Sequence, residues 1–224
     1  MGESSTTRTW DDSKWQRYGL FAGVVFVVLS LVAVFAPGSP PARDASADEI
    51  AKYFVDNDSG IRLAAILAAF ALIFGVWWLG SLWRVISKLE SSGPRLAFVA
   101  AAGFIIAGGF GTIGQALFTV PATRDGELLG ASEFAWSLGF ITFGFALALT
   151  AAHMLALAAL TIRSGFLPKW MGWLALASGL VCAVGTIGAG SEEAAIGIIG
   201  FIGYLTWLLW VLLASVLLYR RKAV

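Results

Sequence analysis

The chain alternates between long apolar stretches and short polar segments. Six stretches contain about 20 or more mostly apolar residues, which is the length that a helix needs to cross a bilayer. None of them has the polar face that a helix on the surface of a soluble protein carries. The stretches comprise residues 18–36, 61–83, 96–119, 134–162, 170–189 and 194–219. The pattern predicts an all-α polytopic membrane protein, a six-transmembrane-helix bundle over residues 18–219.

The composition agrees with lipid as the surroundings of these helices. Hydrophobic residues make up 58% of the chain and charged residues 13%, against about 45–50% and about 25% in soluble domains. Stretch 18–36 is longer than the apolar core of a secretory signal and follows seventeen mostly polar residues, so we interpret it as a span. The net charge of +1 provides no field that would attract nucleic acid.

Basic residues are distributed unevenly between the segments that separate the stretches. With the N-terminus in the cytoplasm, eleven of the fifteen Lys and Arg residues lie on the cytoplasmic side and four on the other side. Cytoplasmic loops carry such an excess of positive charge. We therefore predict a protein of the cell membrane with both termini on the cytoplasmic side (N-in/C-in). Residues 1–17 then form a cytoplasmic N-terminal tail, and residues 220–224 form a basic cytoplasmic tail.

The largest segment outside the spans is the outer loop at residues 37–60. Ser46 and Glu49 are spaced as a capping box, in which each side chain bonds the backbone of the other residue at the start of a helix. The spacing predicts a short amphipathic surface helix over Ala47–Asp56. This helix either rests on the outer membrane surface or folds over the mouth of the bundle, as a lid or as a packed loop helix.

Two cytoplasmic hairpins resemble each other at an offset of 74 residues. Pro94-Arg95 recurs as Pro168-Lys169, and Gly111-Thr112-Ile113-Gly114 recurs as Gly185-Thr186-Ile187-Gly188. Duplication of a two-helix hairpin and chance identity both explain these matches. Glycines at every third position in the last stretch, at residues 197, 200 and 203, favour close helix packing over a passage lined by glycine.

Ionisable groups inside a membrane are costly and are candidates for function. His153 is the only titratable group well inside a predicted span, on a mildly polar strip that also holds Thr150. It could sense protons or ligate a metal or haem; the alternative is a neutral ring bonded to a backbone carbonyl or to a Thr on a neighbouring helix. Gln115 either joins two helices or orients a ligand. The candidate ligand-binding residues are Thr112, Gln115, Thr150, His153 and Thr186.

Sequence motifs for known chemistry are missing. The chain has no GxGxxG after a strand, no GxxxxGK[ST], no HExxH and no GxSxG. One His and one Cys exclude a zinc site built from several such ligands. We therefore predict no catalytic residue, metal or cofactor, and the sequence gives no support to an enzyme.

Three functions stay open. The first is a non-catalytic scaffold that binds a partner protein or an apolar ligand between its helices. The second is a small permease or facilitator subunit for a neutral or apolar solute, and the third is a membrane redox subunit that uses His153. The expected partners are membrane lipid and, beyond it, another protein or a homo-oligomer, but no nucleic acid.

Two blocks of sequence carry a resemblance to a known family. They are residues 47–82, which begin ADEIAKYFVDNDSGIRLAAIL and end WWLGSL, and residues 164–176, SGFLPKWMGWLAL. The chain resembles small six-span membrane proteins of unknown function that are common in actinobacteria. The resemblance implies a six-helix bundle in the cytoplasmic membrane, and it implies no activity, substrate or catalytic residue.

Overall fold

The computed structural model describes residues 12–123, 129–191 and 193–221, and this part of the chain is helical without strands. Six of the helices are long and apolar enough to cross a membrane, so the all-α six-span bundle is confirmed. The elements are α1 (Asp12–Phe35), α2 (Ala47–Asp56), α3 (Asp58–Ile86), α4 (Arg95–Thr119), η1 (Leu129–Ala131), α5 (Ser132–Ser164), α6 (Lys169–Gly185), η2 (Thr186–Ala189) and α7 (Ala194–Arg220).

Each predicted stretch lies on one long helix, with small differences at the ends. Helix α1 begins at Asp12, six residues before the predicted span, so the last part of the expected N-terminal tail is helical. The rest of that tail, residues 1–11, and residues 222–224 of the expected C-terminal tail lie outside the described residues. In stretch 170–189, the α-helix ends at Gly185 and continues as the 3₁₀ helix η2.

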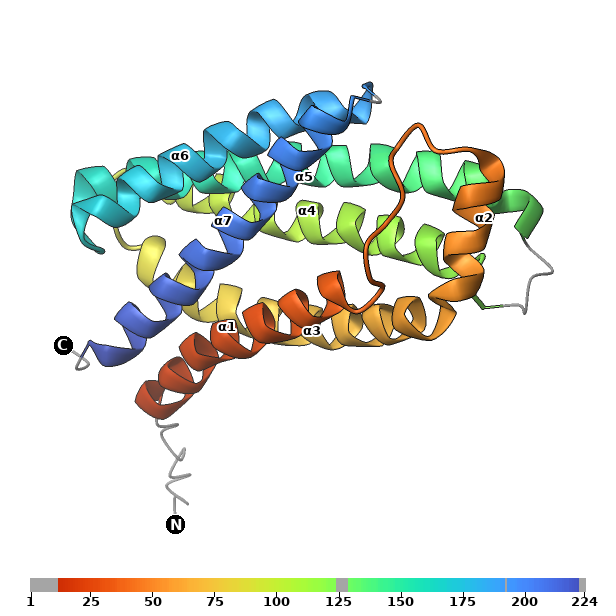
Figure 1. Ribbon diagram of the computed structural model, residues 1–224. Coiled ribbons are helices and arrows are strands. Elements are labelled where there is room, and N and C mark those ends of the chain that lie inside the picture. The colour runs from red at the N-terminus through yellow and green to blue at the C-terminus, as the bar shows by residue number, and fades with distance from the viewer. Residues whose placement is uncertain (1–11, 124–128, 192, 222–224) are drawn as a thin grey trace, which may run out of the picture.

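The long helices form a ring. Helix α1 lies between α3 and α7, α6 lies between α7 and α5, and α4 contacts both α5 and α3. Figure 1 shows the beginning of α1 and the end of α7 at one end of the bundle and α2 across the other end. We call these the terminal end and the lid end.

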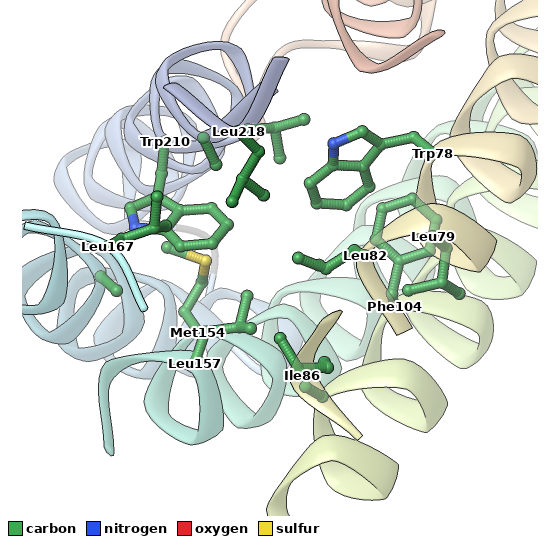
Figure 2. Packing of buried hydrophobic residues seen from close by; sticks show 14 of the residues in the cluster. Trp78, Leu79, Leu82, Ile86, Phe104, Met154, Leu157, Leu167, Trp210 and Leu218 are labelled. Atoms are coloured by element: carbon green, nitrogen blue, oxygen red, sulfur yellow. The ribbon is translucent and has the colours of Figure 1, made fainter. Parts of the chain in front are cut away.

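The interior of the ring is filled by large apolar side chains. Trp78 from α3 and Trp210 from α7 are fully buried, and Met154 and Leu157 of α5 lie between the surrounding helices (Figure 2). Trp210 donates its indole N–H to the carbonyl of Met171 at 2.9 Å. Many large apolar side chains face outward instead, among them Phe70, Val76, Phe98, Phe134 and Ile198. Such a surface fits contact with lipid acyl chains.

Helix α2 packs over one end of the bundle, and we call it the lid helix for this position. Its capping box is present, with Ser46 Oγ accepting from the Glu49 N–H and the Glu49 carboxylate accepting from the Ser46 N–H. Ile50 and Phe54 are buried against Trp136 of α5. Of the two predicted placements, the structure therefore shows the helix folded over the mouth of the bundle.

Candidate functional site

Helix α5 carries His153 into the interior of the bundle, where the side chain is fully buried. Its Nδ1 lies 2.6 Å from the carbonyl oxygen of Ala100 on α4. Because a carbonyl only accepts hydrogen bonds, Nδ1 carries the proton, and in the neutral ring Nε2 is an acceptor. This Nε2 is buried and has no hydrogen-bond partner among the described residues.

The close approach of α4 and α5 depends on a glycine. A Cβ at Gly103 would lie 2.8 Å from the carbonyl oxygen of Leu149 and 3.0 Å from the backbone nitrogen of His153. Any larger residue at this position would push the two backbones apart. Gly103 therefore helps to set the distance over which His153 reaches Ala100.

His153 belongs to a group of rings arranged around Phe104 of α4. Four rings surround Phe104, with centroid distances between 5.5 Å (His153) and 6.0 Å (Trp207). Each comes from a different helix: α1, α3, α5 and α7. We call this group the Phe104 cluster, and its members are Phe26, Trp78, Phe104, His153 and Trp207. Five of the six spanning helices thus meet at one ring.

Three members of the Phe104 cluster carry a buried nitrogen that lacks a partner within the described part of the chain. They are His153 Nε2 and the indole Nε1 atoms of Trp78 and Trp207. An unsatisfied buried polar atom costs about 1–3 kcal/mol, and lipid outside the bundle offers no hydrogen bonds in exchange. The cluster is therefore mostly apolar yet contains one acceptor and two donors without a partner in the described part of the chain.

The other predicted site residues do not join this cluster through any contact that we observe. The hydroxyl of Thr150 donates to the carbonyl of Ala146 within α5, and that of Thr186, at the start of η2, donates to the carbonyl of Cys182 in the preceding α6. Gln115 donates to the Thr119 hydroxyl on the same helix at 3.5 Å, whereas a bond between helices was one of its two predicted roles. Thr112 donates to Gly108 and lies on the exposed side of α4, so it does not line the interior.

Sequence reasoning missed a second arrangement, at the lid end. The guanidinium of Arg43, in the outer loop, lies 4.5 Å from the centroid of the Phe140 ring and donates to the carbonyl of Ser191 at 2.8 Å. A Cβ at Gly188 would lie 3.1 Å from its Nη1. Arg43 therefore ties the outer loop to α5 and to the segment between α6 and α7. A lone Arg in a polar loop gave no signal of these distant contacts.

The lid also holds two groups whose pKa departs from its ordinary value. Hydrogen bonds from the Ser46 backbone and hydroxyl lower the pKa of Glu49, and burial raises the pKa of Tyr53. Within the described residues, no group of three or more His, Cys, Asp or Glu side chains is placed to hold a metal ion.

Comparison with known proteins gives one match. The model of a domain of unknown function, DUF4386, matches residues 21–214. The chain belongs to the DUF4386 family. The DUF4386 match includes the Phe104 cluster, Arg43 and the lid helix, and its description names no activity. No curated protein and no solved structure matches this DUF4386 chain.

Proposed function

We propose that this DUF4386 protein is a non-catalytic protein of the cell membrane that binds an apolar molecule between its helices, next to His153. The observation that carries the proposal is the buried Nε2 of His153, which has no partner in the described part of the chain. A hydroxyl or another O–H or N–H donor on an otherwise apolar molecule would satisfy this acceptor. The indole N–H groups of Trp78 and Trp207 could bind oxygen atoms of the same molecule.

The environment of His153 favours binding over acid–base catalysis. Among the described residues, no carboxylate forms an ion pair with the ring, and its Nδ1 is committed to the backbone of Ala100. The surrounding rings offer apolar surface and weakly polar N–H groups. Ligand sites in proteins are likewise mostly apolar with a few placed polar groups.

The experiment distinguishes the role of Nε2 from that of Nδ1 in His153. In His153→Asn the amide nitrogen takes the place of Nδ1 and keeps the bond to Ala100, while the acceptor at Nε2 is lost. The full chain is purified from membranes in mild detergent, and its organic extract is analysed by mass spectrometry. We expect a molecule that co-purifies with the wild type and is depleted at least tenfold in His153→Asn.

Thr112→Val serves as the matched control, because Thr112 lies on the exposed side of α4 and its bond stays within that helix. It should retain the molecule at the wild-type level. Equal retention by His153→Asn, or a wild type that carries no such molecule, would refute the proposal.

A redox subunit is the second candidate, and one observation favours it. A histidine that ligates a metal commonly donates its other ring N–H to a backbone carbonyl, as Nδ1 of His153 does toward Ala100. This candidate requires a visible absorption band in the purified protein that His153→Ala removes. A colourless wild-type protein would eliminate it.

A permease for a neutral solute would need a different result. Its path through the bundle would pass Gln115 and Thr186, and Thr112 could not contribute because it faces outward. Solute uptake by vesicles that contain the purified protein, above that of empty vesicles, would favour this function. A protein partner or a second copy of the chain remains a further proposal, which the mass of the assembly in detergent would test.

A further inference from the structure

The surface of the bundle has a groove between α1 and α3, near the terminal end. Its volume is about 380 Å³, which is within the range of about 300–1,000 Å³ for small-molecule sites. Trp15 and Gln16 of α1 line one side, and Trp77, Gly80 and Arg84 of α3 line the other. This groove shares no residue with the Phe104 cluster, and its role does not depend on the function proposed above.

The walls of the groove are apolar and continue along the outside of α3. Trp15 and Trp77 stack with their centroids 6.1 Å apart, and about half of each side chain is exposed. Phe70, Ile73 and Val76 extend the same exposed apolar surface toward the middle of α3. In a bilayer this surface is covered by lipid chains, so an acyl chain can run from the groove along α3.

The polar end of the groove suits an anion. Arg84 has five N–H donors in a planar fork, a geometry that matches phosphate. Its Nη1 pairs with Asp12 at 3.1 Å, and both side chains are partly exposed. The other N–H groups of Arg84 can donate hydrogen bonds to a second anion, although the Asp12 carboxylate competes with that anion for the guanidinium. Tryptophan side chains at the same level are typical of the layer of lipid headgroups.

We propose that this groove binds one anionic phospholipid, with its phosphate on Arg84 and an acyl chain against the exposed side of the stacked Trp15 and Trp77 rings and along α3. The lipid belongs to the leaflet at the terminal end. By charge, that end is expected to face the cytoplasm, where anionic lipids attract basic segments. The opening of the groove onto the apolar surface of α3 favours a lipid over a free phosphate ion.

Gly80 offers a way to block the groove without disturbing the fold. A Cβ at Gly80 would meet nothing within 4 Å, so Gly80→Leu fills the groove from its floor. Gly109 on α4 is an exposed glycine with the same open surroundings. Gly109→Leu is therefore the matched control, since it adds the same side chain elsewhere on the lipid-facing surface.

The test uses the full chain in detergent and native mass spectrometry after addition of phosphatidylglycerol or phosphatidylcholine. We expect the wild type to retain one phosphatidylglycerol at least tenfold more tightly than phosphatidylcholine. Gly80→Leu should lose both lipids, and Gly109→Leu should behave as the wild type. Arg84→Gln should lose the preference between headgroups, and Arg84→Lys should restore part of it.

Asp12→Asn should strengthen the binding of phosphatidylglycerol, whereas Gly80→Leu and Arg84→Gln should weaken it. Removal of the competing carboxylate should tighten phosphatidylglycerol at least threefold and leave phosphatidylcholine unchanged. Thermal melting of each variant in detergent verifies that it is folded. Equal retention of the two lipids by the wild type overturns the proposal. Displacement of phosphatidylglycerol by millimolar inorganic phosphate does so too, because it would show that the acyl chain contributes nothing.

Discussion

His153 is held by α4 in two ways, at its ring and at its backbone. The carbonyl of Ala100 fixes the tautomer of the ring, and the missing side chain of Gly103 allows the two helices to approach. The ring then contacts Phe104, which three other aromatic rings also contact. The orientation of Nε2 thus depends on a small residue that makes no polar contact with His153.

We predict that Gly103→Ala destabilises the protein by about 1–3 kcal/mol, because the new methyl group overlaps the backbone of α5. Reversible unfolding in mixed micelles would measure the change. Gly109→Ala is the control, since its Cβ would contact nothing and should leave stability within about 0.5 kcal/mol of the wild type. Equal stability of Gly103→Ala and Gly109→Ala would show that the two backbones are not in close contact.

Single residues were predictable only where their chemistry is rare in a membrane. The sole histidine was conspicuous, and the alternative of a neutral ring bonded to a backbone carbonyl is what the structure shows at Nδ1. Phe104 was not conspicuous, because one Phe among sixteen carries no signal of a central place. The side chains of Gln115 and Thr112 form hydrogen bonds within their own helix. The residue type does not show whether such a side chain bonds its own helix or a neighbouring one.

At the scale of elements, three separate sets of interactions form α2 and hold it against the bundle. The capping box starts the helix, Ile50 and Phe54 bury its apolar face, and Arg43 ties down the loop before it. The first two follow from spacing within a few residues and were predictable. The third joins residues 148 positions apart and could not be inferred from local pattern.

Phe54→Ala should detach α2 from the ends of the spans. The Phe54 side chain is fully buried against rings of α4 and α5, and truncation of such a side chain costs about 3–5 kcal/mol. Hydrogen exchange in the amides of residues 47–56 should accelerate, with the six spans unchanged. Val55→Ala provides the comparison, because Val55 is exposed and its truncation should leave the exchange rates alone.

The capping box should make the lid sensitive to acid. Hydrogen bonds from Ser46 lower the pKa of Glu49 below its ordinary value of 4.5, so the carboxylate stabilises α2 above that value. This contribution is lost as the pH falls from 4.5 through the lower pKa of the folded state. Amide exchange in residues 47–56, corrected for its intrinsic pH dependence, should therefore accelerate over this window.

In Glu49→Gln the side-chain carbonyl can still accept from Ser46, and it does not titrate. The variant should keep the lid helix and lose this part of the acid response. An unchanged acid response in Glu49→Gln would assign it to other carboxylates of the lid, such as Asp48.

For the whole molecule, the thickness of the bilayer explains why the fold was predictable. It imposes about 20 apolar residues on each span, and the six stretches accordingly lie on six long helices. The order of the helices around the ring was not predictable, because it depends on contacts such as Gly185 against Gly200 and Gly103 against α5. The pattern of apolar residues does not distinguish a side chain that faces lipid from one that is buried inside the protein.

Orientation across the membrane is the property of the whole molecule that charge predicts. Of the lysines that the structure describes, Lys52 alone belongs to the lid end, and Lys169 opens α6 at the terminal end. Both side chains are exposed. Because basic residues concentrate at the terminal end, we expect that end in the cytoplasm. A membrane-impermeant amine reagent applied to intact cells should modify Lys52 and spare Lys169, and inverted membrane vesicles should reverse this result. Modification of Lys169 in intact cells would place the lid, and with it Arg43, on the cytoplasmic side.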